Sequence, residues 1–147
     1  PARIHVAGHS AGAHLATMAA LTEWDGFAPG LPAGLIKSAT AISGVYELEP
    51  IRLSAQNAVL ALAAAAARRN SPMLYARKAV PPLTLAVGTG ETADFIRQQR
   101  DFAAAMIKAG APVATLEIPG RHHFNVIHDL ADPGSKLHAA VRARMGI

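Results

Sequence analysis

Four short apolar runs are separated along the chain by longer segments of mixed character. The runs cover residues 1–7, 35–42, 83–87 and 113–118, and their lengths and flanking Gly and Pro residues are typical of buried strands. Apolar residues at helical spacing lie between them. Short buried strands that alternate with helices are typical of a parallel sheet with crossover helices, so the pattern predicts an α/β fold.

Helices are predicted in three regions. The first covers 13–24, the second covers 92–109 and stops at Gly110, and the third runs from Phe124 to the end with a break near 133–134. The residues expected on the apolar face of the first are Leu15, Met18, Ala19 and Thr22. Those expected on the buried side of the second are Phe95, Phe102, Met106 and Ile107.

The segment between the second and third strands has a weaker pattern. Residues 45–54 predict a loop, and residues 55–69 predict either one alanine-rich helix or a pair of short helices. Ser71 and Pro72 have the residue types of a helix cap and first turn, so another helix is expected to start there.

Composition and charge narrow the class of protein. Of the 147 residues, 51% are hydrophobic and 16% are charged, which predicts one globular domain. The net charge of +4 is spread along the chain, so we expect no nucleic-acid partner. The longest apolar run, residues 58–67, is ten residues, against about 20 for a membrane span. We therefore expect no membrane association, no signal peptide and a cytoplasmic location.

Side chains that bind metals or form disulfides are absent or poorly spaced. The chain has no Cys, which excludes disulfides, thiolate zinc sites and a cysteine nucleophile. His9 and His14 are five residues apart, as are His123 and His128, and neither pair has the i, i+4 spacing of a helical zinc motif. We expect no metal and no cofactor.

The strongest chemical signal is a GxSxG sequence between the first predicted strand and the first predicted helix. It consists of Gly8, His9, Ser10, Ala11 and Gly12. In this context a sharp turn presents the serine, and the glycines leave room around it. The motif predicts Ser10 as a nucleophile and the backbone N–H of Ala11, at the start of the helix, as an oxyanion donor.

A serine nucleophile needs a base and an acid, and in this fold class the order along the chain is Ser, acid, His. Glu91 directly follows the third strand and is the preferred acid. Asp94, three residues later, remains an alternative, although it also suits the N-terminus of the following helix. His122 and His123 both follow the fourth strand, and we expect His123 to be the base.

Three residues flank these turns and are expected to contact a substrate. They are His9, Tyr46 and Phe124. His5 lies inside the first predicted strand and is expected to pack in the core. The remaining histidines, expected at the surface or behind the catalytic groups, are His14, His128 and His138.

Five segments are more specific than the turn alone. They are GHSAGAH at 8–14, ISGVYELEPI at 42–51, RNSP at 69–72, the stretch 87–99 with its Arg-Gln pair, and His-Phe at 123–124. With these segments the chain resembles the α/β-hydrolase superfamily and, within it, the kynurenine formamidase (arylformamidase) group and its esterase relatives. The resemblance covers nearly the whole chain.

The resemblance implies roles for the residues and a class of reaction. By it, Ser10 matches the nucleophile, Glu91 occupies the position of the acid (usually Asp), and His123 matches the base. Members of the group hydrolyse N-formyl-L-kynurenine to L-kynurenine and formate, a step of tryptophan breakdown, and often aryl and short-chain esters. A small-molecule substrate and no cofactor are implied. A carboxylesterase and an inactive interaction module remain the alternatives.

The resemblance also implies what the chain corresponds to in the group. Its members have several strands and a His-Gly-Gly loop ahead of the nucleophile, and no segment here matches them. Residues 1–147 are therefore expected to form a single α/β-hydrolase domain that corresponds to the carboxyl-terminal part of such a hydrolase. An exposed sheet edge would favour pairing in a homo-oligomer or with the missing amino-terminal half.

Overall fold

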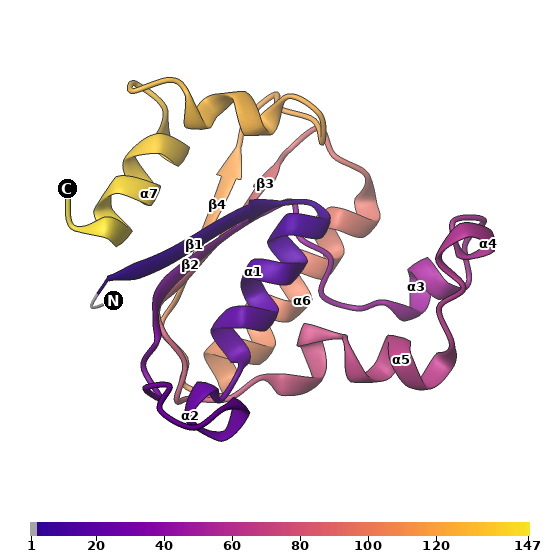
Figure 1. Ribbon diagram of the computed structural model, residues 1–147. Coiled ribbons are helices and arrows are strands. Elements are labelled where there is room, and N and C mark those ends of the chain that lie inside the picture. The colour runs from indigo at the N-terminus through magenta and orange to yellow at the C-terminus, as the bar shows by residue number, and fades with distance from the viewer. Residues whose placement is uncertain (1–2) are drawn as a thin grey trace.

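A four-stranded parallel sheet forms the centre of the fold (Figure 1). The structure is a computed structural model that describes residues 3–147. The strands lie side by side in chain order: β1 (Ile4–His9), β2 (Ile36–Ile42), β3 (Leu83–Gly88) and β4 (Val113–Ile118). The predicted α/β class and parallel sheet are confirmed, and each strand lies close to its predicted position. Residues 1–2 of the first predicted strand lie outside the described residues.

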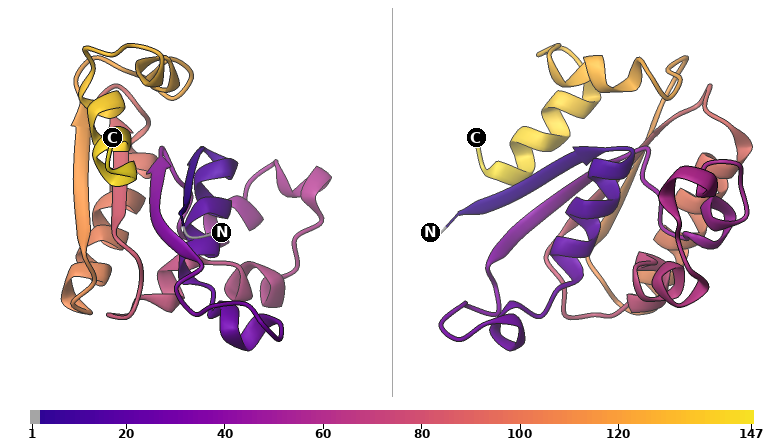
Figure 2. Two further views of the ribbon diagram at one scale, coloured as in Figure 1. Left: turned by 60° about the vertical axis from the view of Figure 1, so that its left-hand side comes forward. Right: turned by 45° about the vertical axis from the view of Figure 1, so that its right-hand side comes forward.

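Helices cover both faces of this sheet. The two longest, α1 (Ala11–Leu21) and α6 (Ala93–Lys108), pack on one face, and α7 (Lys136–Met145) packs on the other (Figure 2). Alternate residues of a strand point to opposite faces. Leu85 accordingly belongs to the cluster under α1 and α6, whereas its neighbour Ala86 belongs to the cluster under α7. Coverage of both faces explains why almost every residue of the central strands β2 and β3 is buried.

All four strands point the same way, so their carboxyl ends meet at one edge of the sheet. The turn from β1 to α1, the loop after β2, the loop from β3 to α6 and the loop after β4 therefore lie near one another (Figure 1). Ligand sites of open α/β sheets lie at this edge. The order also makes β1 an outer strand, with one of its sides unpaired within the described residues.

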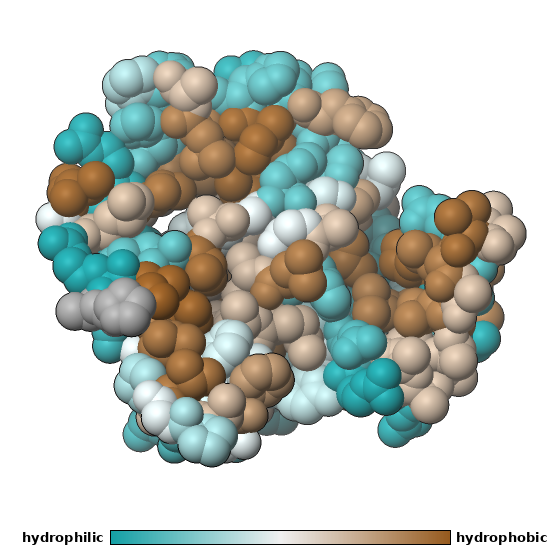
Figure 3. Space-filling model, in the orientation of Figure 1, coloured by the Kyte–Doolittle hydropathy of each residue, from teal (hydrophilic) through white to brown (hydrophobic). Residues whose placement is uncertain are grey.

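Three short helices between β2 and β3 project from the body of the molecule, and we call residues 49–69 the arm (Figure 1). They are α3 (Glu49–Arg52), α4 (Asn57–Leu60) and α5 (Ala64–Arg69). The arm exposes large apolar side chains and appears brown over much of its surface in Figure 3; the most exposed are Leu53, Val59 and Leu60.

The arm corrects part of the sequence prediction. The predicted loop 45–54 contains the single turn α3, and the alanine-rich stretch forms a pair of short helices, which was one of the two alternatives. The pair is separated because Ala61 adopts a left-handed φ of 48° and the Asn57 side chain accepts a hydrogen bond of 2.7 Å from the Leu62 N–H. The pattern of apolar residues could not predict this break, because it does not reveal such local contacts.

The remaining elements are short. They are the helix α2 (Trp24–Phe27) and the two 3₁₀ helices η1 (Pro72–Tyr75) and η2 (Val126–Leu130). The helix expected to start at Ser71 and Pro72 is thus one turn of 3₁₀ helix, and the helical region expected after Phe124 is η2 followed by α7. Within residues 3–147, no helix has the length and apolar character that crossing a bilayer requires.

Two helix faces differ from their predictions. Leu15 is 66% exposed, because α1 packs on the sheet through smaller residues such as Ala13 and Ala16. On α6, Ile107 is 58% exposed, whereas Phe102 and Met106 are fully buried as expected. The helix instead buries two glutamines, Gln98 and Gln99, which an apolar pattern does not reveal.

Candidate active site

The turn between β1 and α1 holds Ser10 in an unusual backbone conformation. Its φ of 58° and ψ of −120° are unfavourable for a residue with a side chain. Gly8 makes the turn possible, because a Cβ there would lie 2.1 Å from the carbonyl oxygen of Gly12. A Cβ at Gly12 itself would meet no atom within 4 Å, so only the first glycine of the motif is required for space.

A chain of hydrogen bonds links three loops at the carboxyl edge of the sheet. The hydroxyl of Ser10 lies 3.0 Å from Nε2 of His123, and Nδ1 of His123 lies 2.9 Å from Oε2 of Glu91. A carboxylate only accepts hydrogen bonds, so Nδ1 carries the proton and Nε2 accepts from the serine. This is the geometry in which an imidazole removes the proton of a serine hydroxyl.

The alternative acid and base lie elsewhere. Asp94 accepts hydrogen bonds from Arg97 at 2.7 Å and from Gln98 at 3.1 Å on its own helix. Arg97 and Gln98 lower the pKa of Asp94 against the opposing effect of burial. His122 is exposed, and its Nδ1 accepts a hydrogen bond of 3.2 Å from the Phe124 N–H. Neither side chain is hydrogen-bonded to Ser10 or to His123.

Close backbone contacts align the loop that carries Glu91 with the loop that carries His123. A Cβ on Gly88 would lie 2.2 Å from the carbonyl oxygen of Arg121, so these two backbones approach more closely than a side chain allows. The N–H of Gly90 donates to the same oxygen at 2.9 Å, and the N–H of Gly120 donates to the Thr89 hydroxyl at 3.0 Å. Glu91 and His123 are therefore held together by the loops that carry them.

The side chain of Glu91 is completely buried and well supplied with donors. Its Oε1 accepts from the N–H of Gly88 at 2.9 Å and from the hydroxyl of Ser43, while Oε2 accepts from His123. A buried carboxylate needs such donors to replace lost hydration. The arrangement leaves Oε2 directed at the base.

Aromatic rings surround the imidazole of His123. The Phe95 ring stacks on it at a centroid distance of 4.3 Å, the His9 ring lies at 4.7 Å, and the Phe124 ring meets it edge-on at 5.5 Å. Burial, and then repulsion by His123 whenever that ring is protonated, lower the pKa of His9, so the neutral form of His9 is favoured. Phe124 is 79% exposed, so its ring lies at the surface beside the base.

The first turn of α1 begins immediately after Ser10. Ala11 opens this helix, and the first N–H groups of a helix have no partner within it. The partial positive charge of the helix N-terminus acts in the same region. The N–H of Ala11, the residue directly after Ser10, stays the predicted oxyanion donor.

Comparison with known proteins places the fold. No known family model matches the sequence. A crystal structure of a protein from Silicibacter sp., assigned as a thioesterase, has a TM-score of 0.76 and 29% identity, over 96% of this chain and 51% of that one. Esterase 2 of Thermogutta terrifontis has a TM-score of 0.60 and 25% identity, over 83% of this chain and 45% of that one. The fold is that of an α/β-hydrolase.

The sequence of this α/β-hydrolase is homologous to kynurenine formamidases. The kynurenine formamidase of Danio rerio is 33% identical over 134 residues, which cover 88% of this chain and 45% of the relative. The chain spans about half the length of the curated relatives it matches.

Tyr46 is placed differently from a substrate contact. It is fully buried and stacks on Phe102 with ring centroids 4.4 Å apart. Burial, and then the charge of Glu91, raise the pKa of the Tyr46 hydroxyl above its ordinary value. In this α/β-hydrolase Tyr46 thus belongs to the core behind the acid, and we do not include it among the proposed substrate contacts.

The other histidines have local hydrogen-bond partners or lie at the surface. Nδ1 of His5 pairs with the Ser38 hydroxyl at 2.8 Å, and Nε2 of His14 pairs with the carbonyl of Asn70 at 2.7 Å. Nδ1 of His138 pairs with a carbonyl at 2.8 Å, and His128 is exposed. Among residues 3–147 there is no group of three His, Asp or Glu side chains able to hold a metal ion.

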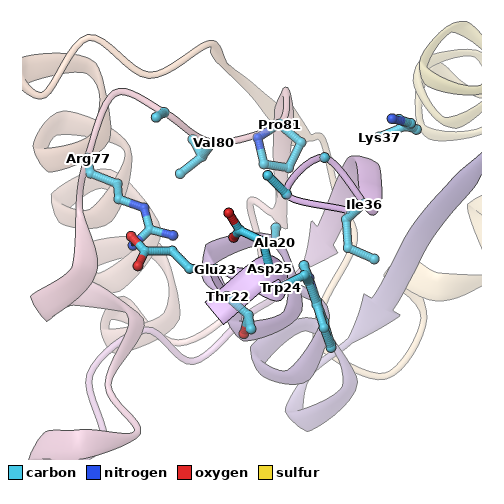
Figure 4. A pocket seen from close by; sticks show the side chains of 13 residues that line it. Ala20, Thr22, Glu23, Trp24, Asp25, Ile36, Lys37, Arg77, Val80 and Pro81 are labelled. Carbon is cyan, nitrogen blue, oxygen red and sulfur yellow. The ribbon is translucent and has the colours of Figure 1, made fainter. Parts of the chain in front are cut away.

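A cavity of about 580 Å³ lies at the other end of the sheet. Its walls include Trp24, Ile36 and Pro81, and the Glu23–Arg77 ion pair of 2.8 Å lies beside it (Figure 4). These residues are near the amino ends of β2 and β3, whereas Ser10 follows the carboxyl end of β1. The cavity is therefore separate from the hydrolase site.

Sequence reasoning missed two residues of the site. Ser43 contacts the acid, and Phe95 stacks on the base. A signal for Ser43 exists, because it directly follows a predicted strand and so lies at the same sheet edge as the other polar groups. Phe95 was expected only as a buried helix residue, and its contact with His123 depends on the long-range arrangement of the loops.

Proposed function

We propose that this chain carries the catalytic residues of a serine hydrolase, with Ser10 as nucleophile, His123 as base and Glu91 as the acid that orients the base. The observation that carries the proposal is the unbroken hydrogen-bond chain from Ser10 Oγ through His123 to Glu91. The strained turn at Ser10 and the burial of Glu91 support it, since both are costly in a protein that does not use them.

The reaction proceeds in two halves. The Ser10 oxygen attacks the carbonyl carbon of a formamide or ester while Nε2 of His123 takes the hydroxyl proton. The oxyanion accepts a hydrogen bond from the Ala11 N–H, and the imidazolium is stabilised by Glu91. His123 then gives its proton to the leaving amine or alcohol. A water molecule, deprotonated by His123, then attacks the acyl-serine. The bond between the acyl carbon and Ser10 Oγ breaks, His123 returns its proton to Ser10 Oγ, and formate or another carboxylate is released.

For the substrate, we propose N-formyl-L-kynurenine, hydrolysed to L-kynurenine and formate as a step of tryptophan catabolism. The homologous proteins of Danio rerio and Salmo salar are named kynurenine formamidases. The aromatic rings beside His123 are suited to an aryl leaving group, and we propose Phe124 and His9 as its contacts.

A carboxylesterase of aryl or short-chain esters is the second candidate, because the structural neighbours include esterase 2 of Thermogutta terrifontis. The two candidates differ in leaving group and share the same nucleophile. The ratio of kcat/KM for N-formyl-L-kynurenine to that for an aryl acetate separates them. A ratio above one favours the formamidase, and a ratio well below one favours the esterase.

The nucleophile itself is tested by covalent labelling. Esterase 2 of Thermogutta terrifontis is phosphoramylated by tabun, an organophosphorus compound. We expect a fluorophosphonate to label this chain at Ser10, located by peptide mass spectrometry, and Ser10→Ala to remain unlabelled with an unchanged circular dichroism spectrum. A folded wild-type chain without an adduct, or an adduct on another serine, would overturn the assignment and favour a non-catalytic interaction module.

A further inference from the structure

Ser43 combines burial, backbone strain and a contact with a charged group. It directly follows β2, it is 1% exposed, and its φ of 52° lies in the left-handed region that a residue with a side chain rarely adopts. Such conformations persist only where the surrounding structure fixes them. The proposed mechanism, with Ser10, His123, Glu91 and Ala11, assigns no role to Ser43.

The sheet fixes the backbone of Ser43, and the backbone directs the side chain. The N–H of Ser43 donates to the carbonyl of Ala86 on β3 at 2.7 Å. From this anchored turn the hydroxyl donates to Oε1 of Glu91, which lies after the end of the neighbouring strand β3. The unfavourable φ is thus coupled to a hydrogen bond with the acid.

The two oxygens of Glu91 consequently have separate partners. Oε1 is held by the Ser43 hydroxyl and the Gly88 N–H, and Oε2 meets Nδ1 of His123. With one oxygen held by two donors, the carboxylate cannot rotate about its last bond without breaking them. A further polar group near this carboxylate is the buried hydroxyl of Tyr46, which has no hydrogen-bond partner among residues 3–147.

We propose that Ser43 is a positioning residue for the acid: its hydroxyl fixes one carboxylate oxygen of Glu91 so that the other stays on the base. The proposal rests on the proposed hydrolase function, because it assigns Ser43 to the same catalytic array. Ser43 contacts neither the nucleophile nor a substrate in this scheme and acts through Glu91.

Two variants separate the hydroxyl from the backbone. Ser43→Ala keeps the Cβ and removes the hydroxyl, while Ser43→Gly also relieves the unfavourable φ and protects the fold. We expect both to slow fluorophosphonate labelling of Ser10, and kcat for ester or formamide, by about 10- to 100-fold, with KM unchanged. Ser38→Ala is the matched control, since Ser38 is also buried on β2 and its hydroxyl pairs with His5 rather than with the acid.

A proton NMR measurement reads the Glu91–His123 bond directly. The Nδ1 proton of His123 should give a far-downfield resonance in the wild type, absent from His123→Ala. We expect Ser43→Gly to shift or broaden this resonance, and Ser38→Ala to leave it unchanged. Wild-type labelling rates in Ser43→Gly, or an unchanged downfield proton, would overturn the positioning role.

The experiment also distinguishes the two proposals. If the wild type is not labelled at Ser10, the hydrolase function fails, while the downfield proton still tests Ser43. A wild type that lacks this proton has no ordered bond between acid and base, and the positioning role is then wrong as well. If labelling occurs normally and both Ser43 variants match the wild type, only the positioning role fails.

Discussion

Gly88 lies where the loop of the acid touches the loop of the base. A methyl group at this position would lie 2.2 Å from the carbonyl oxygen of Arg121, and ordinary van der Waals contact begins at 3.4 Å. Gly88→Ala therefore requires the two backbones to separate by 3.4 − 2.2 = 1.2 Å. Gly88 and Arg121 lie three and two residues before the acid and the base, so most of this movement would open the 2.9 Å bond between them.

We expect Gly88→Ala to slow labelling of Ser10 about 100-fold, because a displacement of about 1 Å in a catalytic array costs a factor of this order. Overpacking should also lower the free energy of unfolding by about 1–3 kcal/mol. Intact-mass spectrometry gives the labelling rate, and urea unfolding followed by circular dichroism gives the stability.

Gly90→Ala is the matched control for this prediction. A methyl group there meets the same carbonyl oxygen at 3.2 Å and requires a movement of only 3.4 − 3.2 = 0.2 Å. Its labelling rate should stay close to that of the wild type. Equal rates for the two variants, or a normal rate in Gly88→Ala, would refute the idea that this close approach aligns the acid with the base.

Three further predictions concern the surroundings of the site. Burial lowers the pKa of His9 in the folded chain, so as the pH falls below about 6.5 the unfolded chain binds a proton at this residue before the folded chain does. The free energy of unfolding of the wild type should therefore decrease more between pH 8 and about pH 5 than that of His9→Phe. Equal decreases in the urea midpoints of the two proteins would contradict this. Gln98→Ala leaves two backbone N–H groups of 46–47 without their acceptor and should cost about 1–3 kcal/mol in urea unfolding, whereas the exposed Gln56→Ala should cost less than about 0.5 kcal/mol. Phe124→Ala removes an exposed ring, so stability should change by less than about 0.5 kcal/mol, while KM for an aryl substrate should rise relative to KM for a methyl ester; an equal change for both substrates would argue against the aryl contact.

The strands were predictable because both faces of the sheet are covered. In β3, Leu83 and Leu85 are buried on one side of the sheet and Ala86 on the other, so every residue of this strand is buried and most are apolar. In α1, by contrast, small alanines make the contact and Leu15 is exposed, so apolar character alone points to the wrong face. The arm was ambiguous for a related reason, since a run of alanines carries almost no periodicity.

In the candidate site, too, some features were predictable from the sequence and others were not. Ser10, Glu91 and His123 follow strands in the expected order and are hydrogen-bonded to one another, so strand ends and residue types were enough to predict that they meet. Their catalytic roles stay a prediction. Ser43 was missed because its contact with Glu91 depends on β2 lying next to β3, which the sequence does not specify. Tyr46 and Ser43 both come after the end of β2. The ring of Tyr46 packs inward against Phe102, which the sequence pattern did not indicate.

The position of β1 at the margin of the sheet has a consequence for reactivity. Among residues 3–147, β1, the strand that leads to Ser10, has a strand neighbour on one side only, whereas β2 and β3, which lead to Ser43 and the acid, are flanked on both sides. A marginal strand frays more readily, so amide hydrogens of β1 should exchange with solvent before those of β3. A ligand or segment that binds along this margin would reduce the local opening of β1 and raise the fraction of molecules in which Ser10 is ordered. By thermodynamic reciprocity, an adduct that orders the turn at Ser10 would strengthen binding along the margin.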